Sequence, residues 1–192
     1  MEAFLVSTGV VALAEIGDKT QLLAFLLAAR FKKPVPIILG ILCATVFNHS
    51  LAGALGAWIT AHVAPGTMRW VLGASFIGMA IWTLIPDKLE EEETRIVSRL
   101  GVFGATLVTF FMAEMGDKTQ IATVAMAAHY GNPVMVVVGS TLGIFITDVP
   151  AVLIGDRLSK KIPMKLVHGI AAGIFAILGI AALLGVDTLL GF

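Results

Sequence analysis

Six apolar stretches, each long enough to cross a membrane, constrain the fold of this chain more than any other feature. A bilayer core of about 30 Å is crossed by roughly 20 residues of α-helix. The stretches that reach this length are residues 3–29, 34–60, 68–86, 100–128, 133–155 and 165–189. The chain is 58% hydrophobic and 14% charged, whereas soluble domains carry about 25% charged residues. The sequence therefore predicts an all-α integral membrane protein with six transmembrane helices.

The basic residues between these stretches predict the orientation, because cytoplasmic loops carry an excess of lysine and arginine. The first, third and fifth loops hold ten of them: Arg30, Lys32, Lys33, Lys88, Arg95, Arg99, Arg157, Lys160, Lys161 and Lys165. The opposite side has only Arg69, and Lys19 and Lys118 lie within predicted spans. We therefore expect both termini outside and the odd-numbered loops in the cytoplasm. The third loop, residues 87–99, contains Glu90 to Glu93 and is interpreted as a solvated acidic linker.

An eight-residue motif occurs twice in the chain, 99 residues apart. Residues 14–21 read AEIGDKTQ and residues 113–120 read AEMGDKTQ, with seven of eight positions identical. Such self-similarity is the signature of an internal duplication. Each half, residues 1–86 and 100–192, holds three predicted spans, and an odd number makes the second half enter the membrane in the opposite orientation. We predict a single membrane domain of two inverted three-helix repeats, an architecture typical of secondary transporters.

Charged residues stand in the middle of the first and fourth apolar stretches. Each motif carries a glutamate and an aspartate three residues apart: Glu15, Asp18, Glu114 and Asp117. A charged side chain at a helix centre costs roughly 2.5–3.5 kcal/mol to insert. The spacing of three places each glutamate and aspartate on one helix face, and the lysine four residues after the glutamate, Lys19 or Lys118, shares that face. These groups must therefore face the protein interior or a wet cavity.

A purely structural role is the simplest alternative for these charges. In that interpretation Glu15 pairs with Lys19, and Glu114 pairs with Lys118. A buried ion pair seldom adds net stability over apolar packing, so structure alone is a weak reason for two such clusters. Four carboxylates and two ammonium groups leave a formal charge of −2, which one divalent cation would neutralise. We therefore interpret the two motifs as a cation site.

The ligand types narrow the choice of ion. Besides the carboxylates, each motif offers neutral oxygens, from Thr20, Gln21, Thr119 and Gln120. Such hard ligands suit calcium, manganese or magnesium. The motif has no cysteine or histidine, which argues against copper(I) and zinc. Gly17 and Gly116 lower helix propensity and could free backbone carbonyls as further ligands, as the broken helices of transporters do.

Polar residues also stand midway along the second apolar stretch of each half. Asn48 and His49 lie near the centre of residues 34–60, and the 99-residue offset places Asp148 at the position equivalent to His49. These side chains could complete the ion site or relay protons. Alternatively, they form hydrogen bonds with neighbouring helices.

The doubled Glu-x-Gly-Asp-Lys-Thr motif, one copy in the first span of each half, resembles the Gdt-type family of cation/proton exchangers. This family includes Golgi calcium/manganese transporters and bacterial MneA-type manganese exporters, within the wider lysine-exporter superfamily. The resemblance covers essentially the whole chain. It implies that Glu15, Asp18, Glu114 and Asp117 are similar in role to the family's ion-binding carboxylates. It also implies exchange of manganese or calcium for protons, and the compact form resembles bacterial members that export manganese across the inner membrane.

Other functions stay open at this point. They are an exporter of a cationic amino acid, a passive cation channel and an intramembrane aspartyl protease. The two motif lysines argue against the protease because they would keep its aspartates ionised. No enzymatic activity is expected, and no cofactor beyond the transported cation. The expected partners are that cation, protons and lipid, and a net charge of zero gives no reason to expect nucleic acid.

Overall fold

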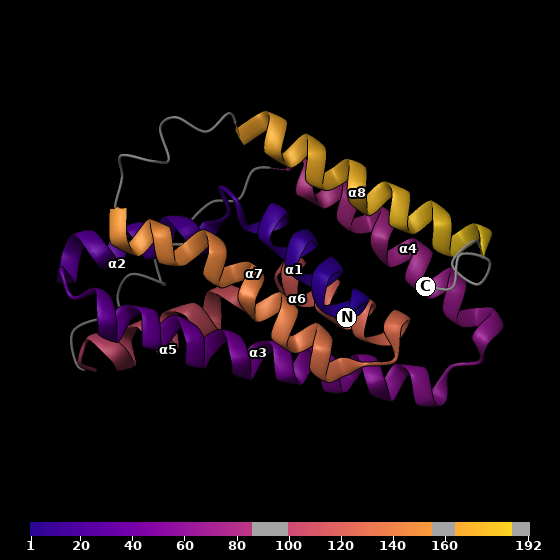
Figure 1. Cartoon of the computed structure of the whole chain (residues 1–192), viewed down its shortest axis with the longest axis horizontal. Helices are drawn as coiled ribbons and strands as arrows, with labels where there is room; N and C mark the ends of the chain where they lie inside the picture. The colour runs from indigo at the N-terminus through magenta and orange to yellow at the C-terminus, as the bar shows by residue number, and fades with distance from the viewer. Residues whose placement is uncertain (86–99, 155–163, 186–192) are drawn as a thin grey trace.

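The computed structural model describes residues 1–85, 100–154 and 164–185, and the regular structure there is entirely α-helical (Figure 1). The helices are α1 (Glu2–Glu15), α2 (Lys19–Phe31), α3 (Pro34–His62), α4 (Pro65–Thr83), α5 (Val102–Glu114), α6 (Lys118–Tyr130), α7 (Pro133–Ile154) and α8 (Met164–Leu184). The all-α prediction is therefore confirmed for these residues. The predicted acidic linker 87–99 lies outside the described residues, as do Arg157, Lys160 and Lys161.

The first and fourth apolar stretches are not continuous helices. The first is divided into α1 and α2, and the fourth into α5 and α6. Each break contains a glycine in the left-handed region, Gly17 at φ +83° and Gly116 at φ +75°, a conformation that glycine adopts without steric cost. Asp18 and Asp117 then cap the helices that follow by accepting hydrogen bonds from Lys19 N and Thr119 N. The helix breaks suggested by the glycines are confirmed.

Two helices in the described part of the chain are individually long and apolar enough to cross a membrane: α3, and residues Pro133–Leu153 of α7. The shorter apolar helices include α5 and residues Gly169–Leu184 of α8. The first and fourth stretches fall short of this length because each is divided at its glycine.

Equivalent helices of the two halves pack in equivalent ways. α1 packs along α7, and α5 packs along α3. A Cβ atom on Gly40 of α3 would lie 2.7 Å from the Cβ of Thr106 on α5. At the equivalent contact, Gly139 of α7 lies directly against Ser7 of α1. Because the members of both pairs are 99 residues apart, the duplicated sequence forms the same close helix contact twice, in the manner of small residues at membrane helix interfaces.

Helices α4 and α8 form a pair that lies to one side of the other six helices (Figure 1). This pair packs against α1 and α6. Among the described residues, α2 and α5 have no comparable packing with it. α6 also fits tightly against α3, where a Cβ atom on Gly56 would lie 2.5 Å from the Val124 carbonyl oxygen. The end of the molecule that contains α1 and α6 is therefore more tightly packed by α4 and α8 than the end that contains α2 and α5.

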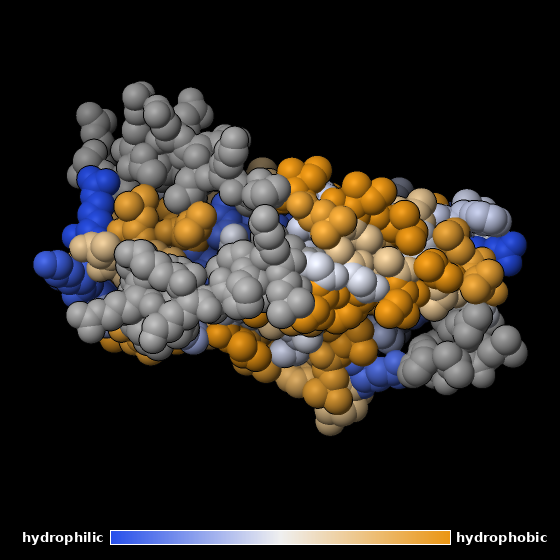
Figure 2. Space-filling model, turned by 90° about the horizontal axis from the view of Figure 1, so that it is seen from above, coloured by the Kyte–Doolittle hydropathy of each residue, from blue (hydrophilic) through white to orange (hydrophobic). Residues whose placement is uncertain are grey.

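The molecular surface carries many exposed apolar side chains. Phe47 of α3, Ile81 of α4 and Ile146 of α7 are 57%, 63% and 53% exposed. Figure 2 shows one face on which hydrophobic residues predominate over the middle of the molecule. Soluble monomers rarely expose contiguous apolar surface on this scale, whereas lipid covers it without cost.

Candidate cation site

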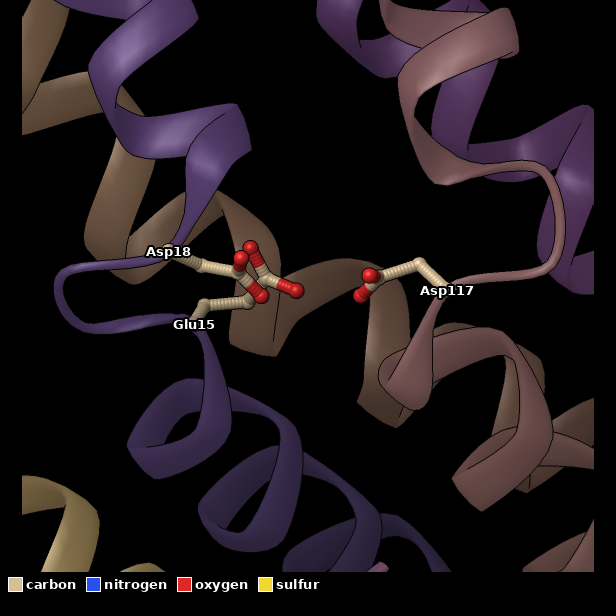
Figure 3. Close-up of side chains that lie close together, drawn as sticks. All are labelled: Glu15, Asp18 and Asp117. Carbon is tan, nitrogen blue, oxygen red and sulfur yellow. The ribbon is translucent and has the colours of Figure 1, made fainter. Parts of the chain in front are cut away.

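The two helix breaks meet in the interior and bring three carboxylates together. Glu15 ends α1, Asp18 begins α2, and Asp117 begins α6. One ligand oxygen from each lies within 4.8 Å of the other two. Figure 3 shows Glu15 and Asp18 on one side of the site, directed toward Asp117 on the other. All three are at most 2% exposed, so this cluster of negative charge is held away from solvent.

The lysines of the two motifs pair across the site. Lys118 Nζ of the second motif lies 3.0 Å from Asp18 Oδ2 of the first, and Lys19 Nζ lies 3.6 Å from Asp117 Oδ1. The expected stripe of Glu, Asp and Lys on one continuous helix is wrong, because the chain turns at the glycine between the glutamate and the lysine. The structural alternative named the pairs Glu15–Lys19 and Glu114–Lys118, whereas the lysine ion pairs of the described residues are Lys19–Asp117 and Lys118–Asp18, which join the two halves.

The neutral side chains of the motifs hold this geometry in place. Thr20 Oγ1 donates a hydrogen bond to Glu15 Oε2, and Thr119 Oγ1 donates to Glu114 Oε2 at 3.2 Å. The two glutamine oxygens accept from the glycine amides of the breaks, with Gln21 Oε1 2.9 Å from Gly17 N and Gln120 Oε1 2.7 Å from Gly116 N. The threonines therefore orient the glutamates, and the glutamines stabilise the breaks.

Glu114, the fourth motif carboxylate, lies outside the group formed by Glu15, Asp18 and Asp117. Its Oε2 is 4.0 Å from His49 Nε2, and both side chains are fully buried. His49 Nδ1 is 2.7 Å from Ser140 Oγ on α7. Sequence reasoning missed Ser140, because the offset places an isoleucine, Ile41, at its equivalent position; nothing in the duplication pointed to it.

The other two polar residues of α3 and α7 have different surroundings. Asn48 Nδ2 donates to the Phe111 carbonyl oxygen on α5 at 3.0 Å, so Asn48, like His49, forms a hydrogen bond with a neighbouring helix. Asp148 is fully buried and lies within electrostatic range of Glu15. Glu114 is similarly within range of Glu15 and Asp117. Asp148 is therefore within electrostatic range of both motif glutamates, whereas His49 lies beside Glu114.

Several buried polar side-chain atoms of this cluster have no hydrogen-bond partner among the described residues. They are Glu15 Oε1, Glu114 Oε1, Asn48 Oδ1, Asp148 Oδ2 and His49 Nε2. A buried acceptor left unsatisfied costs about 1–3 kcal/mol, and more when it is charged. With Asp148 included, five carboxylates face two lysines, an excess of three negative charges when all are ionised. Both features fit a site that receives a cation.

Comparison with known proteins agrees with this chemistry. A family model described as "Divalent cation/proton antiporter GDT1" matches the chain twice, over residues 3–91 and 102–188. A Vibrio cholerae protein described as "Putative manganese exporter" is 48% identical over 94% of this chain and 90% of its own length. "GDT1-like protein 4" of Oryza sativa subsp. indica is 32% identical over 91% of this chain and 70% of its own length.

A more distant relative, "GDT1-like protein sll0615" of Synechocystis, is 28% identical over 93% of this chain and 96% of its own length. No solved structure gives a significant match. The two family matches begin at residues 3 and 102, the same 99-residue offset that separates the motifs. The chain therefore belongs to the GDT1 family of divalent cation/proton antiporters.

Proposed function

We propose that this protein exports Mn²⁺ from the cytoplasm in exchange for protons, with the ion bound among Glu15, Asp18, Glu114 and Asp117. The observation that carries the proposal is the meeting of Glu15, Asp18 and Asp117, from both motifs, in a buried cluster with ligand atoms within 4.8 Å. Export of manganese is supported by the description of the Vibrio cholerae relative. Membership in an antiporter family removes the protease alternative, because such proteins are transporters.

The proposed topology is six membrane spans in two inverted repeats, with both termini outside the bacterial inner membrane. In this arrangement α1 with α2, and α5 with α6, each form one span that is broken at its centre. Helix ends at a break are common where transporters bind ions, because the surrounding protein satisfies the freed backbone groups. The repeated Gly–Ser/Thr helix contacts and the two family matches support the duplication. The excess of basic residues in the odd-numbered loops supports the orientation.

The packing of α4 and α8 supports a mechanism of alternating access. In the proposed orientation these helices cover α1 and α6, which form the outer half, and leave α2 and α5, which form the inner half, without comparable packing. We take this arrangement as the state that is closed to the outside. Because the two repeats are inverted copies, α4 and α8 could pack on α2 and α5 in the way that they now pack on α1 and α6. That movement would open the site to the outside.

The charge of the site provides a reason for coupling to protons. A divalent cation would reduce the excess of three negative charges to one, and loss of the metal would leave crowded carboxylates that favour protons. Protons and metal would therefore compete for the same oxygens. Inward movement of protons down their gradient would then drive metal out of the cytoplasm.

The first test is Mn²⁺ and Ca²⁺ flux into proteoliposomes of the purified protein, with metal and internal pH recorded together. We expect Mn²⁺ uptake that requires an opposing proton flux and reverses when the pH gradient is reversed. Ca²⁺ flux measured in the same assay shows which of the two ions the protein transports faster. Metal flux without proton movement would contradict the exchange and indicate a channel. Absence of flux for both ions would contradict the proposal and favour a cationic amino acid as substrate.

The orientation is tested with single-cysteine variants. Cys43, the one cysteine of the sequence, is first replaced in a Cys43→Ser background. Lys33→Cys precedes α3 and Arg69→Cys lies in the first turns of α4, and both positions are exposed. We expect a membrane-impermeant maleimide to label Arg69→Cys on intact cells and Lys33→Cys only after lysis. The background protein without cysteine controls for non-specific labelling. The opposite labelling pattern would reverse the proposed orientation.

A further inference from the structure

We propose that His49 is a nitrogen ligand of the transported cation and that it makes the site favour Mn²⁺ over Ca²⁺. This inference rests on the cation site proposed above and adds a ligand from outside the two motifs. His49 lies near the middle of α3 and is fully buried. Its Nδ1 is 2.7 Å from Ser140 Oγ on α7, and its Nε2 is 4.0 Å from Glu114 Oε2 on α5.

The surroundings of Ser140 favour one tautomer of the His49 ring. Ser140 Oγ donates its only hydrogen to the Val137 carbonyl oxygen at 3.2 Å. With that hydrogen on Val137, the same Oγ accepts from His49 Nδ1 at 2.7 Å, the tautomer that our proposal uses. In the neutral ring Nε2 is then an acceptor with a free lone pair. Nε2 lies 4.0 Å from Glu114 Oε2.

The separation of His49 Nε2 and Glu114 Oε2 fits two ligands of one ion better than a hydrogen bond. At 4.0 Å the two atoms are too far apart for a hydrogen bond. Ligand nitrogen and oxygen atoms lie about 2.0–2.2 Å from Zn²⁺, so two of them on one ion of similar size lie at most about 4.4 Å apart. His49 Nε2 also has no hydrogen-bond partner among the described residues. A histidine with a purely structural role would be expected to satisfy both ring nitrogens.

A nitrogen ligand changes which ions the site prefers. Ca²⁺ binds oxygen ligands almost exclusively, whereas sites with nitrogen ligands bind all first-row divalent metals, with Mn²⁺ the weakest of them. The equivalent position in the other half carries Asp148, which lies within electrostatic range of Glu15 and offers only oxygen. An all-oxygen site would suit both ions. Because one of the two equivalent positions carries His49 and not a carboxylate, the proposed site discriminates against Ca²⁺.

Electron spin-echo spectroscopy of Mn²⁺ bound to the purified wild-type protein tests the ligand directly. We expect modulation from a ¹⁴N nucleus that changes to the ¹⁵N pattern when the protein is labelled with ¹⁵N-histidine. His49→Gln, which places an oxygen near the position of Nε2, should lose the modulation. The matched control is His62→Gln, because His62 lies on the same helix, is exposed, and stacks on Trp58.

Selectivity is measured by competition of Ca²⁺ against bound Mn²⁺ in the same proteins. We expect His49→Gln and His49→Asp to lower the Mn²⁺/Ca²⁺ affinity ratio about tenfold or more, and Ser140→Ala to weaken Mn²⁺ binding by about 10–100-fold, as loss of a ligand-orienting partner does. Wild-type Mn²⁺ binding without nitrogen modulation would overturn the role of His49 and leave the carboxylate site intact. An unchanged Mn²⁺/Ca²⁺ affinity ratio in both His49 variants would also overturn the role of His49. Failure of the wild type to bind either ion would instead contradict the proposed function.

Discussion

Replacing Glu15 with glutamine is expected to abolish Mn²⁺/proton exchange. Glu15 contributes an oxygen to the buried group with Asp18 and Asp117, and its Oε1 has no other partner among the described residues. The amide keeps the size of the side chain and removes the charge that attracts the ion. Loss of an outer partner of a metal ligand reduces activity about 10–100-fold, so loss of the ligand itself should exceed that range. Proteoliposome flux at saturating Mn²⁺ measures the effect.

The matched control for this prediction is Glu2→Gln, on the same helix α1. Glu2 lies in the first turn, far along the helix from the break, and is not part of the carboxylate group. It should retain nearly normal exchange. Asp117→Asn in the second motif should resemble Glu15→Gln, because both halves contribute to one site. Near-normal flux in Glu15→Gln, with wild-type amounts of inserted protein, would show that the cluster is not the transport site.

Replacing Lys118 with methionine is expected to destabilise the protein far more than the same change at Lys19. Lys118 is fully buried and lies 3.0 Å from Asp18, whereas Lys19 is 20% exposed and lies 3.6 Å from Asp117. Removing one partner of a buried ion pair typically costs about 3–5 kcal/mol because it leaves an uncompensated charge. Thermal unfolding of the two variants in detergent compares the two positions, which the duplication makes equivalent in sequence.

Two further observations separate this charge effect from lost packing. The double variant Asp18→Asn/Lys118→Met should recover much of the stability, because it leaves no unpaired carboxylate at Asp18. Mn²⁺ should also raise the unfolding temperature of Lys118→Met more than that of the wild type, because the variant site is more negative. Equal unfolding temperatures for Lys118→Met and Lys19→Met would contradict the assigned ion pairs.

Much of the architecture could be predicted from local features of the chain. Long apolar stretches require helices in lipid, and the confirmed all-helical structure of the described residues follows from them. The glycines of the two motifs indicated the breaks, because the tendency of a helix to end at Gly17 or Gly116 depends on the backbone conformation of that residue. The 99-residue offset indicated the duplication, and the doubled motif indicated the family that the comparisons confirm.

The partners of the site residues depended on tertiary structure. The lysines pair across the halves, Glu15 joins Asp18 and Asp117, and Glu114 faces His49 instead. Periodicity within one helix cannot predict these contacts, because each break redirects the chain and ends the helical register between glutamate and lysine. The contacts arise only when α1 packs on α7 and α5 on α3, which brings the two breaks together in the interior. By itself, therefore, the sequence determined which residues carry charge into the membrane, and the packing of the two halves decided which of them meet.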